Sequence, residues 1–227
     1  MFADRTAAGR QLAEQLRGVV GREAVVLALP RGGIPVARPV AAALGAPLDV
    51  LAARKLGFPG EPELAIGAVT ARGHRVLHDE LLRNVVLPPG YLAAETARQT
   101  RRAAELERRL RDGRTPEPLA DREVVIVDDG IATGMTVRAA IADVRDRRPG
   151  AVIVAAPVIA YTTYLALSQL ADRVVAVLVP AEFRAVGEFY RNFDQVEDAA
   201  AARLLAEAAE APGRVPRRDR PRRLSGH

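Results

Sequence analysis

The segment Val124-Val-Ile-Val-Asp-Asp-Gly-Ile-Ala-Thr-Gly-Met-Thr136 decides the fold that this chain adopts. It starts with four apolar residues, continues with the acid pair Asp128 and Asp129, and passes through a short loop into a helix that we expect to begin near Thr136. An unbroken apolar run that ends in a turn is typical of a strand buried on both faces of a parallel sheet. Ligands of such sheets bind beyond the carboxyl ends of the strands, where this loop lies.

The same alternation of apolar runs and helical segments continues along most of the chain. The runs predict further strands at 24–29, 48–53, 151–157 and 173–179, and helices at 6–19, 35–44, 136–146, 162–170 and 197–209. Residues 54–63 are rich in glycine and proline and are predicted to be a loop, followed by a hairpin over 65–70 and 75–78. The pattern predicts an α/β fold with a mostly parallel sheet flanked by helices.

The composition is that of a globular protein and excludes several kinds of chemistry. Of 227 residues, 49% are apolar and 27% are charged, and there is no cysteine, so disulfides, thiolate zinc sites and cysteine nucleophiles are excluded. No secretory signal follows Met1, and we expect a cytoplasmic protein. Residues 149–171 carry no charge, but Pro157 and several polar residues interrupt them, which favours a buried strand and helix over a membrane span.

The basic charge lies almost entirely at the end of the chain. The formal net charge is +5, and residues 213–227 contain six arginines and one aspartate, so they carry the whole excess. Residues 1–212 are formally neutral, which gives no reason to expect nucleic acid as a partner of this part. The tail 213–227 has no apolar period and is predicted to be disordered, with a tether to nucleic acid or membrane as the less favoured alternative.

The loop after the central strand suits a phosphate group bound beside a sugar. Gly130 and Gly134 allow backbone amides to converge, the following helix adds a partial positive charge, and Thr133 and Thr136 add hydroxyl groups. Carboxylates repel phosphate, so the acid pair needs another partner, such as vicinal hydroxyl groups or a divalent cation. The alternative is that the acid pair only ends the strand and caps the next helix.

This segment resembles the phosphoribosyl-pyrophosphate motif of type I phosphoribosyltransferases, in which a hydrophobic strand, two acids and a loop ending Thr-Gly-x-Thr follow one another. The resemblance extends over nearly residues 1–200 and implies one domain, 1–212, with a small hood formed by segments around 1–20 and 180–200. It implies that Asp128 and Asp129 hold the ribose hydroxyl groups and an associated Mg²⁺, directly or indirectly. It also implies that the 5-phosphate binds the loop residues Ala132, Thr133, Gly134, Met135 and Thr136.

Three other segments lie where the family places the rest of its site. By the resemblance, Arg31 meets the pyrophosphate in Pro30-Arg-Gly-Gly33, and Gly32 and Gly33 permit close backbone approach. Lys55, the only lysine of the chain, lies in a region similar to the family's mobile loop and would reach the leaving pyrophosphate. Phe183 matches the aromatic that stacks on the base in purine-salvage members, although a hydrophobic lid explains it nearly as well.

The chain departs from the purine-salvage pattern, and the acceptor is left open. Ala132 replaces an acid of the hypoxanthine-guanine members, residues 152–158 lack their purine-reading lysine, and Arg191 falls where a further acid is expected. The resemblance therefore implies a Mg²⁺-dependent, homodimeric transferase that uses phosphoribosyl pyrophosphate and an unidentified acceptor. The alternative is a regulator that only senses this ligand and contacts nucleic acid through its tail. The charged segment Tyr91–Leu110 is predicted to be a surface or subunit-contact helix without an assigned role.

Overall fold

The computed structural model describes residues 1–21 and 23–210 and is built around a five-stranded parallel sheet. The strand order is β2-β1-β6-β7-β8, and every neighbouring pair is parallel. The strands are β1 (Val25–Ala28), β2 (Leu48–Val50), β6 (Glu123–Val127), β7 (Ala151–Val158) and β8 (Arg173–Leu178). The predicted α/β fold with a mostly parallel sheet is confirmed.

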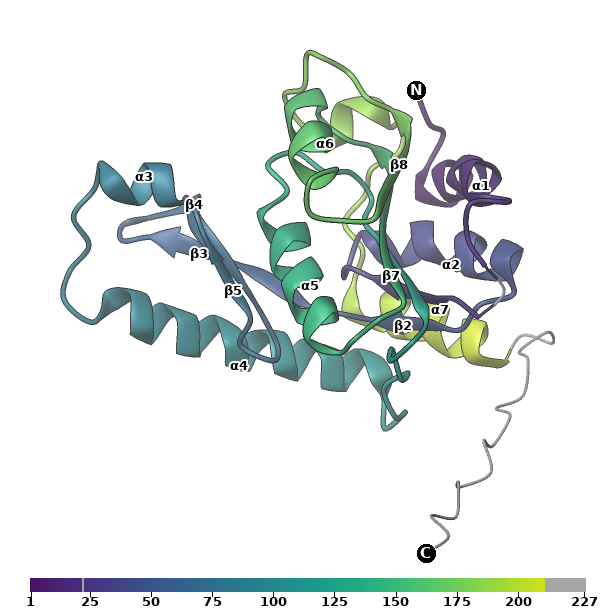
Figure 1. Cartoon of the computed structure of the whole chain (residues 1–227), viewed down its shortest axis with the longest axis horizontal. Helices are drawn as coiled ribbons and strands as arrows, with labels where there is room; N and C mark the ends of the chain where they lie inside the picture. Colours follow the sequence, from purple (N-terminus) through teal and green to yellow (C-terminus); the bar gives the residue numbers. More distant parts are fainter. Residues whose placement is uncertain (22, 211–227) are drawn as a thin grey trace, which may run out of the picture.

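Helices cover both faces of this sheet (Figure 1). One face packs against α1 (Arg5–Leu16), α2 (Gly33–Leu44) and α7 (Asp198–Glu210). The other face packs against α5 (Met135–Asp146) and α6 (Tyr161–Leu167). The tail 213–227, which the sequence predicts to be disordered, lies outside the described residues, and so does the predicted end of the domain at 212.

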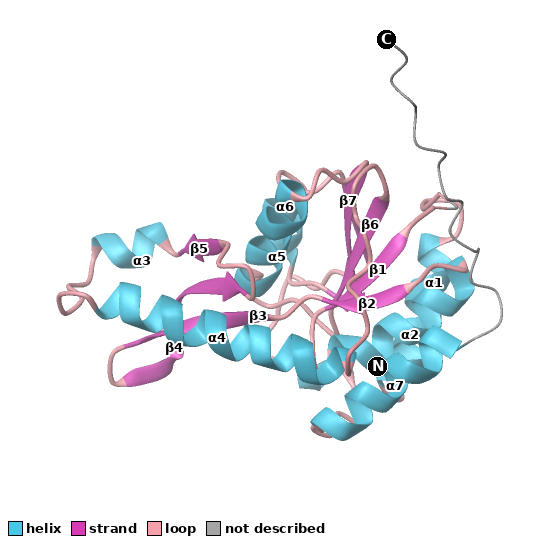
Figure 2. Cartoon of the chain, turned by 90° about the horizontal axis from the view of Figure 1, so that it is seen from below, coloured by secondary structure: helices cyan, strands magenta, loops and turns pink. Residues whose placement is uncertain are grey.

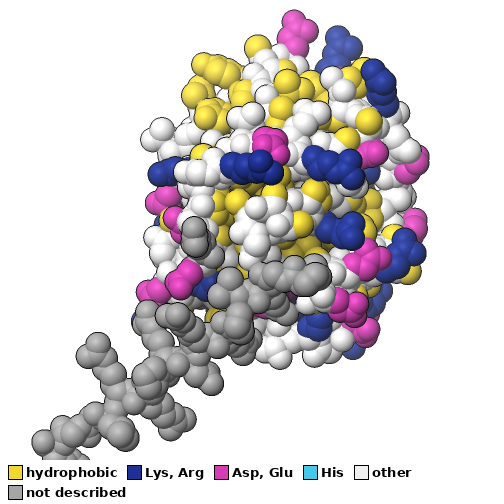
Figure 3. All heavy atoms as spheres, turned by 90° about the vertical axis from the view of Figure 1, so that its right-hand side faces the viewer, with side chains coloured by type: hydrophobic (Ala, Val, Ile, Leu, Met, Phe, Trp, Pro, Cys, Tyr) yellow, Lys and Arg dark blue, Asp and Glu magenta, His cyan; other side chains and the backbone are white. Residues whose placement is uncertain are grey.

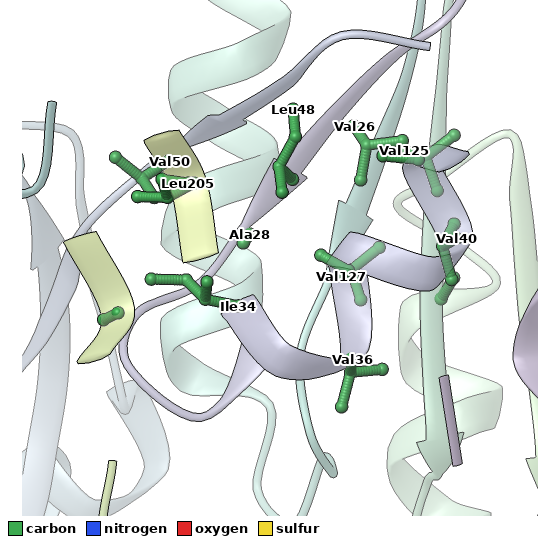
Figure 4. Close-up of a cluster of buried hydrophobic side chains, with 14 of the residues drawn as sticks. Val26, Ala28, Ile34, Val36, Val40, Leu48, Val50, Val125, Val127 and Leu205 are labelled. Carbon is green, nitrogen blue, oxygen red and sulfur yellow. The ribbon is translucent and has the colours of Figure 1, made fainter. Parts of the chain in front are cut away.

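Burial on both faces explains why the strands are unbroken apolar runs. Val26 and Ala28 of β1 point toward α2 and α7, where Leu205 closes the cluster (Figure 4). The intervening residues Val25 and Leu27 belong to the cluster on the opposite face, against α5. Because consecutive strand residues point to opposite faces, a polar residue at Val25, Val26 or Leu27 would lose about 1.5–3 kcal/mol of burial free energy.

A second, antiparallel sheet projects from the body as an arm (Figures 1 and 2). It consists of β3 (Ala53–Phe58), β4 (Glu61–Thr70) and β5 (Arg75–Leu77), and a short helix, α3 (Asp79–Arg83), follows it. The predicted hairpin of 65–70 and 75–78 is confirmed, but the prediction of a loop over 54–63 is wrong. Glycine and proline suggested a loop, whereas here Gly60, at φ +80°, forms the tight turn between β3 and β4, and the pairing is irregular around Gly57.

The long charged helix α4 (Tyr91–Arg111) covers this second sheet and also reaches the core (Figure 2). Tyr91 packs near Leu56 of β3, and Leu106 and Leu110 belong to the main hydrophobic cluster. The helix was predicted to lie on the surface or against a partner, but one of its faces is buried within its own chain. The polar Glu107 is also buried, where it accepts a hydrogen bond of 2.8 Å from the Ala52 amide.

The two predicted hood segments meet beside the carboxyl edge of the main sheet. The Phe2 amide donates to the Phe189 carbonyl at 2.8 Å, and the Arg191 amide donates back to the Phe2 carbonyl at 2.8 Å. The short 3₁₀ helix η1 (Val186–Phe189) lies in the second segment. These two hydrogen bonds hold residues 1–4 against residues 186–192.

Acids and arginines are mixed on one face of the body. The face that carries α1, α2 and α7 shows both kinds side by side rather than one basic patch (Figure 3). Arg38 and Glu207, for example, form an ion pair at 3.0 Å. Within residues 1–21 and 23–210, no helix is both long and apolar enough to cross a membrane.

Candidate active site

The acid pair lies at the carboxyl edge of the sheet, directly after β6, and its two carboxylates have different surroundings. Asp128 Oδ1 accepts a hydrogen bond from the Asp129 amide at 2.9 Å. Asp129 Oδ2 accepts a hydrogen bond from Arg5 Nε at 2.8 Å, in a pair whose side chains are 14% and 11% exposed. Burial raises the pKa of Asp128 well above its usual value, and the neighbouring charge of Asp129 raises it further. Burial also raises the pKa of Asp129, and Arg5 opposes that rise.

The loop Pro30–Gly33, between β1 and α2, lies directly against the acid pair, and its Pro30–Arg31 peptide is cis. A Cβ atom on Gly32 would overlap with Asp129 Oδ2, and one on Gly33 would lie 2.6 Å from the Val127 carbonyl oxygen. Both positions therefore require glycine. β1 and β6 are neighbours in the sheet, so the fold brings this loop and the acid pair together, as the sequence predicts.

Arg31, the cation of this loop, is paired with an acid that the sequence analysis did not single out. Its Nε lies 2.5 Å from Asp198 Oδ1, in the first turn of α7. Arg109 of α4 shares the same carboxylate, at 3.2 Å from Oδ2. Arg31 thus links the loop Pro30–Gly33 directly to α7, and the shared Asp198 links both to Arg109 of α4.

The loop 130–134, which is predicted to hold a phosphate and is called the phosphate loop below, presents open backbone donors at the start of α5. Gly134 adopts φ +71°, a left-handed conformation that suits glycine, immediately before the first helical residue. Within the described part of the chain, the amides of residues 132–134 donate to no protein acceptor, and Ala132 and Thr133 are exposed. The Met135 side chain is buried against the second sheet, so only its backbone faces this loop. Free amides at a helix N-terminus are a suitable arrangement for binding an anion.

The predicted hood segments reach the acid pair through side chains that are distant in sequence, Arg5 and Tyr190. The Tyr190 hydroxyl donates to the Asp129 carbonyl oxygen at 2.5 Å. The Arg5 guanidinium lies 3.8 Å from the centroid of the Phe193 ring, and its Nη1 donates to the Asp194 carbonyl at 2.8 Å. No local sequence pattern identifies Arg5 or Tyr190 as a site residue, because each reaches the acid pair only through tertiary packing.

Phe183 belongs to the aromatic cluster of the hood. Its ring centroid lies 5.2 Å from that of Phe189, and it is half-buried. In the same hood segment, Val186 lies against Gly130, where an added Cβ would overlap its side chain, so the hood touches the start of the phosphate loop. Stacking of Phe183 on a base stays a prediction.

Lys55 is exposed on β3 and lines a cavity of about 460 Å³ together with Thr136, which follows the phosphate loop. The second sheet thus brings the only lysine of the chain to the loop that is predicted to hold a phosphate. Arg31, Lys55, Asp128 and Asp129 all lie around the carboxyl edge of the sheet, although their catalytic roles stay predictions.

The acid pair offers two neighbouring carboxylates, a donor set that suits a divalent cation. The described residues contain no cluster of three or more histidine, cysteine, aspartate or glutamate side chains that could hold a metal by themselves. Mg²⁺ is usually held by one or two carboxylates together with substrate phosphates, and it keeps several waters. Asp128 and Asp129 provide that number of carboxylates next to the loop with free amides.

The family model of the phosphoribosyl transferase domain matches residues 3–187. The chain therefore belongs to this family. The crystal structure of TT1426 from Thermus thermophilus is 41% identical in sequence, with a TM-score of 0.77 over 91% of this chain and 98% of that one. Two proteins of Mycobacterium tuberculosis, from strains CDC 1551 and H37Rv, carry provisional phosphoribosyl transferase names and are each 47% identical over 201 residues. This match covers 87% of the chain but only 45% of each mycobacterial protein, so the chain spans less than half of their length.

Proposed function

We propose that this protein transfers the phosphoribosyl group from phosphoribosyl pyrophosphate to a nitrogenous acceptor and releases pyrophosphate. The observation that carries the proposal is the contact of Gly32 and Gly33 with the acid pair, beside a loop of free amides at the start of α5. One edge of the sheet thereby offers carboxylates for hydroxyl groups and, beside them, a loop of free amides for a phosphate.

Each part of this edge has a defined task in the proposed reaction. Asp128 and Asp129 accept hydrogen bonds from the ribose hydroxyl groups, and the amides of residues 132–136 hold the 5-phosphate. Arg31 and Lys55 stabilise the negative charge that develops on the departing pyrophosphate. When Mg²⁺ is bound by the acid pair and the substrate, it supplies further positive charge to the phosphates.

The reaction breaks the bond between ribose C1 and the pyrophosphate oxygen and forms a bond from the acceptor nitrogen to C1. The bond electrons leave with pyrophosphate, and the proton of the acceptor nitrogen passes to the released pyrophosphate or to water. Positive charge develops on the ribose while negative charge develops on pyrophosphate, so the protein needs no covalent nucleophile. Holding the sugar at both its hydroxyl groups and its phosphate leaves the opposite face of C1 open to the acceptor. The hood and the arm that carries Lys55 are positioned to exclude water, whose attack would waste the donor.

The acceptor, the assembly and the compartment belong to the same proposal. Ala132 offers no carboxylate to a purine, so we propose an acceptor other than a 6-oxopurine. We also propose that two copies of the chain pair and that the protein works in the cytoplasm, without a membrane partner. Sedimentation of the purified protein tests the pairing.

Titration calorimetry with phosphoribosyl pyrophosphate, with and without Mg²⁺, tests the proposed site. Binding should require Mg²⁺ and should weaken at least tenfold in the double variant Asp128→Asn/Asp129→Asn. The control is Glu14→Gln/Glu105→Gln, which removes two negative charges at exposed positions outside the site. Equal binding by the site variant and the control would refute the assignment.

Incubation with the donor, Mg²⁺ and a panel of nitrogenous bases then tests turnover. Release of pyrophosphate with one base supports the transferase. Binding without release for any base, together with nucleic-acid affinity that disappears when residues 213–227 are deleted, would instead support the sensing regulator.

A further inference from the structure

A second cavity lies among the three helices that cover one face of the main sheet (Figure 1). It has a volume of about 340 Å³ and is lined by residues of α1, α2 and α7 and of the link from α2 to β2. Neither the loop Pro30–Gly33 nor the acid pair lines it. Sites for small molecules usually measure roughly 300–1,000 Å³, so this volume suits a small ligand.

Most of the lining of this cavity is apolar. Ala41 and Leu48 are buried there, at 4% and 6% exposure, and Pro39, Pro47 and Ala208 lie beside them. On this face of the body, apolar side chains are exposed between the acids and arginines (Figure 3). Covering such a surface with an apolar ligand is favourable, by about 25 cal/mol for each Å² removed from water.

The charged groups of the lining leave one positive charge without a partner. Arg38 and Glu207 form an ion pair at 3.0 Å, and Arg203 lies 3.8 Å from the other oxygen of Glu207. Within residues 1–21 and 23–210, Arg10 is exposed and forms neither an ion pair nor a side-chain hydrogen bond. A free guanidinium group can bind a carboxylate through two parallel hydrogen bonds. The cavity therefore combines an apolar surface with a site for one negative charge.

Each of the three helices also carries or holds a residue of the candidate active site. On α1, Thr6 lines the cavity, and the preceding residue, Arg5, binds the acid pair. The first residue of α2 is Gly33, which lies against the acid pair. On α7, Asp198 holds Arg31. A ligand in this cavity therefore contacts the elements that arrange the active site.

The helices α1 and α2 pack closely beside the cavity. A Cβ atom on Gly9 would overlap with the Val36 carbonyl oxygen and would lie 2.6 Å from Pro39 Cγ. Arg10 follows Gly9 in the chain, and Pro39 lines the cavity. Because closely packed elements transmit strain, a ligand between Arg10 and Pro39 stabilises the present position of α1 against α2.

We propose that this cavity binds a small carboxylic acid with an apolar body and that the bound acid weakens binding of the donor. Arg10 is the ligand for the carboxylate, and the apolar lining takes the body. In this structure Arg31 is paired with Asp198, and Arg5 occupies the acid pair. A ligand that stabilises the present arrangement of the helices retains these pairs, which a donor has to loosen. The effect on the donor rests on the proposed function, whereas the binding site does not.

Titration calorimetry of the full chain with octanoate, without donor, tests the carboxylate contact. We expect binding to weaken about tenfold in Arg10→Gln, because a charge-assisted hydrogen bond is lost. The control is Arg17→Gln, which removes the same charge at an exposed position at the end of α1, outside the cavity. Octanol has the same apolar body without the charge, so it should bind both variants alike.

A second pair of variants tests the apolar part of the cavity. Ala42→Phe places a large side chain in the cavity and should abolish octanoate binding. Ala43→Phe makes the same change at the next position of α2, which is exposed and does not line the cavity, and should retain binding. Circular dichroism confirms that all variants are folded.

Three results would overturn the proposed site. The first is that the unaltered protein does not bind octanoate, and the second is that Arg10→Gln and Arg17→Gln lose equal affinity. The third is that Ala42→Phe separates paired copies of the chain in sedimentation, because the cavity would then be part of a subunit contact.

Donor titrations with and without saturating octanoate test the coupling. We expect octanoate to lower the affinity for phosphoribosyl pyrophosphate at least about threefold, and the donor to lower the affinity for octanoate by the same factor. Ala42→Phe should show no such coupling, and an unchanged donor affinity in the unaltered protein would refute the effect on the donor. If the protein binds no donor at all, the proposed function fails, while octanoate binding and its loss in Arg10→Gln still decide whether the cavity is a site.

Discussion

Replacing Arg5 by methionine should destabilise the protein through the acid pair rather than through the helix that carries Arg5. The substitution keeps a long side chain but removes the hydrogen bond of 2.8 Å to Asp129 Oδ2 and the contact of 3.8 Å with the Phe193 ring. Asp129 is then left mostly buried without its cation, since its side chain is only 14% exposed.

The expected loss follows from the cost of an unpaired buried charge. Breaking a buried pair costs about 3–5 kcal/mol, and because this pair is partly exposed we expect about 3 kcal/mol near neutral pH. For a chain of this size that loss lowers Tm by roughly 6–12 °C. The loss should shrink under acidic conditions, because protonation of Asp129 removes the uncompensated charge.

Thermal unfolding followed by circular dichroism at several pH values measures this effect. Arg10→Met, an exposed position on the same helix, is the control and should leave Tm nearly unchanged. The double variant Arg5→Met/Asp129→Asn should recover most of the loss, because it removes both charges. Equal Tm values for the variants at positions 5 and 10, or simple addition of losses in the double variant, would refute the reasoning.

Three other predictions concern buried acids and the phosphate loop. The pKa of Asp128 is raised in the native state, so above pH 3.8 the native state binds more protons than the unfolded chain. The free energy of unfolding should therefore fall as the pH rises above 3.8. In urea titrations at several pH values, Asp128→Asn should show a flatter dependence of this free energy on pH. Asp143 is 1% exposed and accepts a hydrogen bond from Arg147 Nη2 at 2.6 Å. Asp143→Ala should therefore lower the free energy of unfolding by about 3–5 kcal/mol, and a loss below about 1 kcal/mol would contradict this. Gly134→Ala should cost about 1–2 kcal/mol by placing a side chain at φ +71°, and its Cβ would lie 2.8 Å from Thr163 Cγ2; unchanged urea midpoints would contradict that.

The sequence predicted the parts of the site that lie within one segment. The run Val124–Thr136 contains its own strand, acids, turn and helix start, and the structure arranges them in that order at the sheet edge. Pro30–Gly33 was predicted to face the same site, and strand pairing between β1 and β6 places it there. Such features follow from side-chain period and turn chemistry, which are local properties.

The arm was predicted poorly because its stability comes from a distant element. Residues 54–63 contain the glycines and prolines of a loop, yet β3 pairs along its length with β4, and its Leu56 is covered by side chains of α4. The local signal for a loop was overridden by packing against a helix more than 30 residues away in the chain.

The amino-acid order by itself determined the parallel sheet, the acid pair and the glycine loops, because those depend on neighbours within a few residues. Only the folded structure decided that Arg5 neutralises Asp129, that Asp198 holds Arg31, and that Arg102 faces the cavity shared with Lys55. These contacts join segments separated by tens to more than a hundred residues. Ion pairing depends on distance in space, which a linear pattern of charges does not specify.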